Sequence, residues 1–265
     1  MEAPGIQYYL NIFDDYVQKF DNDTQSENIR LKIRHSYAVC NNIIKLSLAE
    51  NLRSEQMRRA KIVAIFHDIA RFLQFDQFGT FRDDLSFNHA EKGVQILKEE
   101  NILSEETKKS RDLINAAIRF HNRESIPANK LDKNTLCLSK LIRDADKLDI
   151  FETSINYHLS NKPLGEINSA IELDLPESSQ LHPGAVKDIL QGRIVDSDHV
   201  ASVNDLILLQ MGWVFDINFQ STMKIIKARQ YIPKLSRALS SNGKMDKIMK
   251  ALNRRIEKVA TDKVS

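Results

Sequence analysis

Histidine and aspartate residues at five separate places in the first 150 residues are the side chains best suited to chemistry. The strongest signal is the adjacent pair His67-Asp68, because it interrupts an apolar run that begins at Ile62. A polar pair in such a run must find partners or carry a high desolvation cost. Two interpretations are open: His67 and Asp68 satisfy each other and nearby backbone groups in a polar core network, or they bind a metal ion as a neutral nitrogen and an anionic oxygen ligand.

Further residues of the same types fall on expected helices or helix ends. His121 follows Ile118 by three residues, which places it on or beside the buried face of its helix. Asp146 follows Ile142 by one turn and borders the inner face of another. Neutral imidazoles and carboxylates hold divalent transition metals, and a helical bundle can bring such groups together. The complete candidate set is His35, His67, Asp68, His89, His121 and Asp146.

The elements that must position these residues are expected to be helices. Only 8 glycines and 6 prolines occur in 265 residues, and Leu, Ile, Ala, Lys and Glu are abundant, a composition that predicts an all-α protein. Apolar positions recur at helical spacing along most of the chain. We expect helices over 6–20, 26–51, 54 to soon after 71, 88–98, 104–121 and 133–159, a short helix near 186–191, and further helices between about 200 and 260.

The length and the hydrophobic content, 42%, predict one large domain that covers residues 1–265. We expect its core over about 26–159 and a C-terminal helical layer over about 160–265. Trp213, which follows the helical spacing of its segment, is expected in the core of that layer.

Charge and cysteine content exclude several classes of protein. Lys plus Arg (38) nearly balances Asp plus Glu (36), which argues against a general attraction to nucleic acid or to an anionic membrane and leaves a local basic patch open. Cys40 and Cys137 are the only cysteines, without CxxC spacing, so we expect no disulfide framework or thiolate zinc site and a reducing, cytoplasmic setting. No apolar stretch approaches the roughly 20 residues that span a bilayer, and we expect no membrane partner.

The order of these residues resembles the HD-domain superfamily of metal-dependent phosphohydrolases. The order is H…HD…H…H…D, with Ile-Ala-Arg after the HD pair and the last aspartate inside the sequence DADKLD. The resemblance covers about residues 30–156 and implies an all-α HD-domain helical bundle. It also implies four metal ligands, His35, His67, Asp68 and Asp146, with Asp68 bridging wherever two metals are bound.

The resemblance also assigns roles around the metal. His89 and His121 match two further histidines that hold a second metal in binuclear branches and contact the substrate phosphate in mononuclear ones. Lys147 resembles a lysine that contacts phosphate in nucleotide-hydrolysing members. Arg71 is either a contact for phosphate charge or only the salt-bridge partner of the buried pair. The expected catalytic set is therefore Asp68, His89, His121, Arg71 and Lys147.

The expected activity is metal-dependent hydrolysis of a phosphomonoester or phosphodiester in a small, nucleotide-like substrate. One or two divalent ions are expected, and Mn, Fe, Co, Ni, Zn and Mg all remain open. The aromatic segment 75–87 and the segment after Ser160 are candidates for substrate selection. The oligomeric state stays open.

Departures from the superfamily pattern leave the branch unidentified. Ala70-Arg71 stands where many members have Gly-Lys or a catalytic Glu. The sequence HNRESIP, which begins at His121, stands where one branch has a glycine-tyrosine-proline signature. Two alternatives therefore stay open: a regulatory module that binds a metal and a phosphorylated ligand without turnover, and a metal-dependent nuclease.

Overall fold

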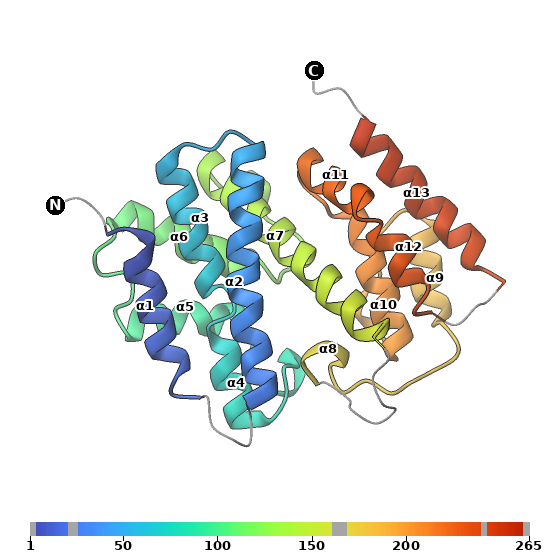
Figure 1. Cartoon of the computed structure of the whole chain (residues 1–265), viewed down its shortest axis with the longest axis horizontal. Helices are drawn as coiled ribbons and strands as arrows, with labels where there is room; N and C mark the ends of the chain where they lie inside the picture. Colours follow the sequence, from blue (N-terminus) through green and yellow to red (C-terminus); the bar gives the residue numbers. More distant parts are fainter. Residues whose placement is uncertain (1–3, 21–25, 161–168, 240–242, 262–265) are drawn as a thin grey trace. The chain divides into compact units, whose positions relative to one another are not determined.

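The computed structural model of the chain describes residues 4–20, 26–160, 169–239 and 243–261. Every regular element in these residues is helical and none is a strand, which confirms the all-α prediction (Figure 1). No helix among them is long and apolar enough to cross a membrane. The α-helices are α1 (Ile6–Val17), α2 (Ser26–Ala49), α3 (Ser54–Phe66), α4 (Ala70–Phe78), α5 (His89–Glu99), α6 (Lys108–Phe120), α7 (Lys133–His158), α8 (Ser169–Glu172), α9 (Pro183–Leu190), α10 (Val203–Gly212), α11 (Gln220–Ala228), α12 (Tyr231–Ser236) and α13 (Met245–Thr261). Short 3-10 segments are η1 (Asp83–Leu85), η2 (Ala128–Lys130), η3 (Ser197–His199) and η4 (Trp213–Phe215).

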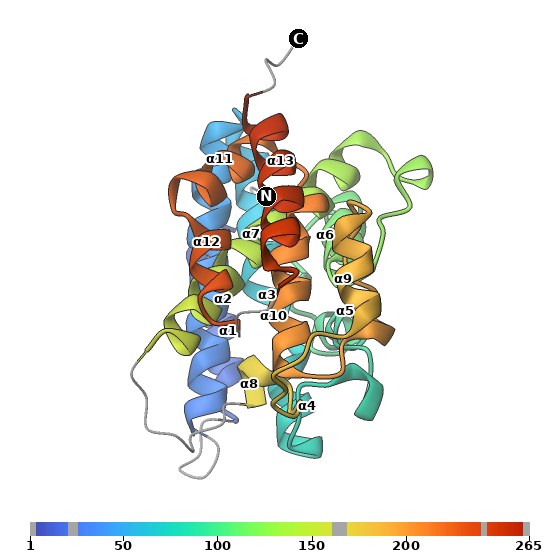
Figure 2. The same cartoon turned by 90° about the vertical axis from the view of Figure 1, so that its right-hand side faces the viewer.

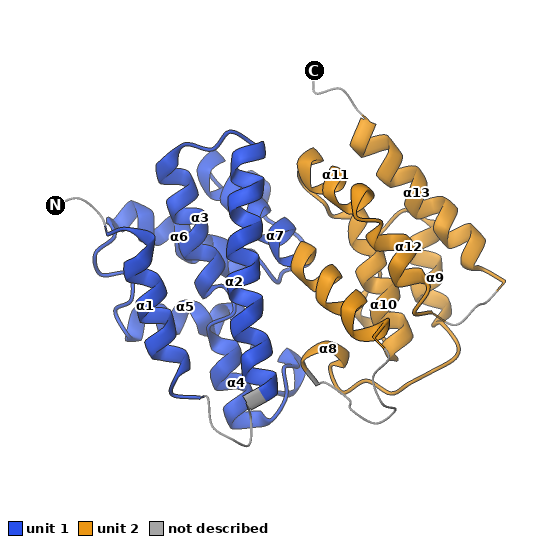
Figure 3. Cartoon of the chain, in the orientation of Figure 1, with its two compact units in different colours: residues 1–146 blue, residues 147–265 orange. Residues whose placement is uncertain are grey.

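The chain divides into two compact units, residues 1–146 and 147–265 (Figure 3). The division falls inside α7, between Asp146 and Lys147. Each unit is described by itself below. The expected single domain with a core over about 26–159 stays a prediction.

Helix α3 forms the centre of the first unit. Its residues 62–66 have no exposed surface, and α1, α2 and α6 pack against it (Figure 1). The Phe66 ring contacts two aromatic rings of α1, with centroid distances of 6.4 Å to Tyr9 and 6.1 Å to Phe13. Helix α1 is therefore part of the core that surrounds the HD pair.

The expected continuous helix from Ser54 to beyond Arg71 is wrong. Helix α3 ends at Phe66, and a turn over 67–69 separates it from α4. The imidazole Nδ1 of His67 lies 2.7 Å from the Ala64 carbonyl oxygen, which a continuing helix would offer to a backbone N–H. The turn is closed instead by tighter bonds, such as that from the Ile69 N–H to the Phe66 carbonyl at 3.2 Å. A side chain of the HD pair thus breaks the helix that carries it.

Two other boundaries also differ from expectation. Helix α4 extends to Phe78 and ends at Gly79, whose φ of +66° suits glycine, so the first residues of the expected loop are helical. Helix α6 begins after Thr107, whose hydroxyl accepts a hydrogen bond from the Ser110 N–H at 3.2 Å, and not at Ser104. Glu106, just before this cap, is held in a buried ion pair with Arg58, a tertiary contact that the residue types at 104 and 107 do not reveal.

The second unit contains the C-terminal half of α7 and helices α8 to α13. Helix α9 packs against α10 and α13, and α11 packs against α12 and α13 (Figure 2). The short helix expected near 186–191 is α9, which starts slightly earlier because His182 caps it and Pro183 occupies its first turn. Helix α8 was not expected, and residues 161–168 of the segment after Ser160 lie outside the described residues.

Trp213 packs on another aromatic ring of the second unit but is only half-buried, so it lies at the edge of the core in which it was expected. Its ring lies 5.7 Å from that of Phe151, on the C-terminal half of α7. The helices expected between about 200 and 260 are confirmed as α10 to α13.

Candidate metal centre

The structure brings the six candidate residues of the first unit together. They come from the middle of α2, the turn after α3, the first residue of α5, the residue that ends α6, and α7. All are buried except Asp146, whose side chain is 18% exposed. The set is His35, His67, Asp68, His89, His121 and Asp146.

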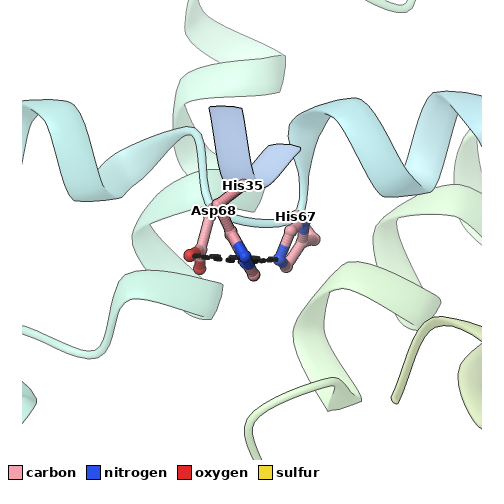
Figure 4. A group of neighbouring side chains, drawn as sticks. All are labelled: His35, His67 and Asp68. Carbon is pink, nitrogen blue, oxygen red and sulfur yellow. Dashed lines mark hydrogen bonds and ion pairs between the residues drawn. The ribbon is translucent and has the colours of Figure 1, made fainter. Parts of the chain in front are cut away.

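The first group of donors is formed by His35, His67 and Asp68 (Figure 4). The Nε2 atoms of His35 and His67 lie 3.3 Å apart. Asp68 Oδ2 lies 3.7 Å from the His35 Nε2 and 3.9 Å from the His67 Nε2. Asp146 joins them, because its Oδ1 lies 3.1 Å from the His35 Nε2 and 3.7 Å from the His67 Nε2.

The second group consists of Asp68, His89 and His121. The Nε2 atoms of His89 and His121 are 3.0 Å apart. Asp68 Oδ1 lies 3.4 Å from the His89 Nε2 and 3.7 Å from the His121 Nε2. The two oxygens of one carboxylate therefore face two different pairs of histidines.

Hydrogen bonds at Nδ1 fix the tautomer of three of these rings. The Nδ1 atoms of His67 and His121 lie 2.7 Å from the carbonyl oxygens of Ala64 and Ile118, each three residues earlier. The His89 Nδ1 lies 2.7 Å from Asp83 Oδ2. Carbonyl and carboxylate oxygens only accept, so each Nδ1 carries the proton and each neutral ring keeps its lone pair on Nε2.

This donor set fits a divalent transition metal. Within each group the donor atoms all lie within 4.8 Å of one another. Lone pairs on the Nε2 atoms of His89 and His121, only 3.0 Å apart, repel each other unless a proton or a cation lies beside them. Imidazole nitrogen with carboxylate oxygen is the ligand combination that Mn, Fe, Co, Ni and Zn accept.

The carboxylates of the centre are held in their ionised form. Burial alone would raise the pKa of Asp68, but the Lys32 ammonium, with its Nζ 3.0 Å from Oδ2, and the neighbouring histidines outweigh burial and hold this pKa well below its usual range. Burial likewise opposes ionisation of Asp146, and hydrogen bonds to His35 and His67 keep its pKa well below the usual range. Ionised oxygens are the form that binds a metal.

The pKa of His89 is lowered to about 3, because burial and the nearby Arg71 guanidinium disfavour a second proton. The Asp83 carboxylate opposes this effect only in part. His89 is thus neutral near pH 7, as a metal ligand must be. The pKa of Asp83 falls to about 2, because its interactions with His89 and Arg71 outweigh burial.

Comparison with known protein families agrees with this geometry. Residues 33–150 match the HD-domain family. This segment is an HD domain. The match confirms the predicted resemblance to the HD-domain superfamily. No curated protein and no solved structure matches the chain with significance.

The two cations that were predicted to contact phosphate, Arg71 and Lys147, both have carboxylate partners. Arg71 Nη1 donates to Asp83 Oδ1 at 2.9 Å, and its Nε lies 3.6 Å from Asp68 Oδ1. Lys147, the first residue of the second unit, forms an ion pair with Asp216. Arg71 therefore lies beside the donor groups, and the expected phosphate contact of Lys147 stays a prediction.

Two residues next to the centre were missed by the sequence analysis. Lys32 stands three residues before His35 on α2, a spacing that places both on one helix face and could have indicated it. Asp83 lies in the aromatic segment six residues before His89, on η1. The chain between them, residues 86–88, forms no regular element, so the sequence carried no signal for their contact.

Proposed function

We propose that the HD domain binds two divalent metal ions and hydrolyses a phosphoester bond in a small, nucleotide-like molecule. The observation that supports two ions is that Asp68 directs one carboxylate oxygen toward each pair of histidines. In this proposal the first position uses His35, His67, Asp68 and Asp146, and the second uses Asp68, His89 and His121.

The donor set favours Mn, Fe, Co, Ni or Zn over Mg, because Mg²⁺ is usually bound by oxygen and four imidazoles converge here. When bound, such ions lower the pKa of a coordinated water and offset the negative charge on a phosphoryl group.

The residues of the chain provide orientation, charge and exclusion of water. The Nδ1 hydrogen bonds hold three rings with their lone pairs inward, and the ionised Asp68 joins the two groups of donors. Lys32 and Arg71 place positive charge 3.0 Å and 3.6 Å from the Asp68 oxygens. In this proposal the same charge helps to offset that of a phosphate at the centre. The buried environment strengthens these interactions relative to water.

Aromatic side chains after the HD pair support a nucleotide-like substrate. Phe78 is 48% exposed and its ring lies 5.7 Å, edge to face, from that of Phe87. An exposed ring can stack on a base.

Both cysteines, Cys40 and Cys137, are free, which supports the proposed reducing, cytoplasmic setting.

The test is elemental analysis and hydrolysis assays of the wild type and Asp68→Asn. We expect about two metal ions in the wild type, loss of both ions in the variant, and hydrolysis of nucleotides or of simple phosphomonoester and phosphodiester substrates by the wild type alone. Asp76→Asn is the matched control, because Asp76 is an exposed residue of the nearby α4.

The same assays separate the alternatives. Metal content and hydrolysis that survive Asp68→Asn would contradict the proposal. Ligand-induced thermal stabilisation of the metal-loaded protein without any product would indicate a regulatory module. Cleavage of a single-stranded oligonucleotide, with nucleotides left intact, would indicate a nuclease.

A further inference from the structure

The Asp83 carboxylate is a hydrogen-bond hub outside the six donor residues. Its oxygens lie 2.7 and 2.8 Å from the His89 Nδ1, a bonding arrangement that holds the ring from the side opposite to the centre. It also accepts from Arg71 Nη1 at 2.9 Å, from the Gln74 amide at 3.0 Å and from the Asn122 amide at 3.2 Å. Four side chains from α4, α5 and the residues after α6 therefore meet on one carboxylate.

This hub decides how His89 presents its ring. An imidazole at the first residue of a helix can rotate, and its proton can occupy either nitrogen. A carboxylate at Nδ1 keeps the proton there, leaves the lone pair on Nε2, and makes Nε2 a stronger donor to a metal. Partners of this kind change metal affinity by about 10- to 100-fold when they are removed.

His67 and His121 have no such dependence on a side chain. Their Nδ1 atoms are held by the backbone carbonyls of Ala64 and Ile118, which no substitution removes. The hydrogen bonds of Asp83 within the described residues reach His89 of the second group and none of the residues that belong only to the first. Asp83 thus acts directly on one ligand of the second group.

We propose that Asp83 is a positioning residue that sets the affinity of the second metal position, that of Asp68, His89 and His121, and leaves the first position unchanged. The inference rests on the proposed two-metal function. It assigns to the segment between α4 and α5 the control of whether the centre holds one ion or two.

The test compares Asp83→Asn with Asp84→Asn in the full chain. Both changes replace a carboxylate by an amide on η1, but the Asp84 side chain is 64% exposed and pairs with Arg82 at 2.6 Å. Metal-free protein is titrated with Mn²⁺, and bound ions are counted by calorimetry and by the electron paramagnetic resonance signal of free Mn²⁺. His89→Ala, which removes the ligand itself, marks the behaviour expected from loss of the second position.

We expect two bound ions in the wild type and in Asp84→Asn. In Asp83→Asn the affinity of the first ion should stay within about twofold, and that of the second should fall by about 10- to 100-fold. Excess Mn²⁺ should restore two bound ions in Asp83→Asn but not in His89→Ala. A role limited to folding would not produce this selectivity between positions.

Three results would overturn the inference. If Asp83→Asn binds both ions like the wild type, Asp83 does not position the ligand and the proposed function still stands. If both affinities fall together, or the metal-free variant no longer unfolds cooperatively, Asp83 is a general structural residue. If the wild type binds fewer than two ions, the two-metal function fails, and the inference fails with it.

Discussion

At the scale of single residues, the ammonium of Lys32 competes with a metal ion for the Oδ2 atom of Asp68. Lys32 Nζ lies 3.0 Å from Asp68 Oδ2, the oxygen that faces His35 and His67, and both side chains are largely buried. In the absence of metal the ammonium compensates the buried carboxylate. When a dication binds, the two positive charges repel each other across a few ångströms.

Lys32→Met should therefore have opposite effects on the metal-free and metal-loaded protein. The metal-free variant should lose about 3–5 kcal/mol of unfolding free energy, because a buried carboxylate loses its partner. Its affinity for the first Mn²⁺ should rise by roughly tenfold or more, because the competing charge is gone. Urea unfolding and calorimetric titration measure the two quantities.

Lys45→Met, an exposed position on the same helix, is the control and should change neither quantity. If Lys32→Met binds Mn²⁺ with the same affinity as the wild type, the Lys32 ammonium does not oppose metal binding at Asp68.

Residue order allowed prediction of the candidate donors, because histidine and aspartate are rarely placed in an apolar run without a polar partner or a ligand. The supporting residues could not be predicted in the same way. Asp83 contacts His89 through a loop, and Lys147 meets Asp216 from 69 positions away. Such contacts depend on the tertiary structure, and the spacing of residues in a single sequence does not reveal them.

At the scale of helices, Glu106 joins three elements in a buried network. Its carboxylate accepts from the Tyr9 hydroxyl of α1 at 2.7 Å and from the Ser110 hydroxyl of α6 at 2.5 Å. It also accepts two hydrogen bonds from the Arg58 guanidinium of α3, at 2.6 and 3.0 Å. Although burial opposes ionisation, these bonds lower the pKa of Glu106 from 4.5 to about 2.

The network predicts a loss of stability in acid. A carboxyl whose folded pKa is depressed contributes stability that is complete above the unfolded value of 4.5 and is lost as the pH falls toward about 2. The contribution of Glu106 is about 3 kcal/mol. Glu106→Gln should lower the unfolding free energy at pH 7 by about that amount and flatten its pH dependence between these two values.

Chemical unfolding at a series of pH values checks this, with the exposed neighbour variant Glu105→Gln as the control. A Glu106→Gln profile parallel to the wild type would show that the carboxylate does not titrate at a depressed pKa.

Helix α5 packs against the turn over 67–69, and at Gly93 of α5 there is room for one methyl group. A Cβ there would lie 3.5 Å from Ile69 Cγ2 and 3.8 Å from Ile118 Cγ2, ordinary contact distances. Gly93→Ala should raise the unfolding free energy by about 0.5–1 kcal/mol, because glycine inside a helix costs conformational entropy. Gly93→Leu should lower it by about 1–3 kcal/mol through overpacking.

Urea unfolding of the two variants measures both effects, and Mn²⁺ binding should be unchanged in Gly93→Ala. A lower unfolding free energy in Gly93→Ala than in the wild type would mean that the contact between α5 and the turn over 67–69 does not tolerate even a methyl group.

Helix existence could be predicted from hydrophobic spacing, but two helix ends could not. The apolar run continues through the HD pair, so its period gives no sign that the His67 ring takes a backbone carbonyl and ends α3. Ser104 and Thr107 are both suitable caps by residue type, which alone would favour Ser104. The buried ion pair of Glu106 with Arg58, which lies just before the observed cap, could not be read from the sequence.

At the scale of the whole molecule, the only tryptophan and the candidate metal centre belong to different units. Trp213 lies in residues 147–265, and the six donor residues lie in residues 1–146. Helix α7 is continuous across the division and carries Asp146 beside Lys147. Melting of the first unit must therefore unravel a helix that the second unit shares.

Mn²⁺ should consequently raise the thermal midpoint reported by Trp213 fluorescence together with the midpoint reported by helical circular dichroism. His89→Ala should reduce both shifts. If Mn²⁺ raises the midpoint from circular dichroism but not the midpoint from Trp213 fluorescence, the two units unfold separately.

Helices α1 and α7 also determine which piece of the chain could be transferred to another protein with the HD domain intact. The family match begins at residue 33, after α1, and ends at residue 150, before the buried Phe151 of α7. A gene fragment cut at those positions would lose the two α1 rings that cover Phe66 and would end in the middle of a helix. The segment that matches the family is therefore shorter than the piece of the chain that keeps the packing around Phe66 and the whole of α7.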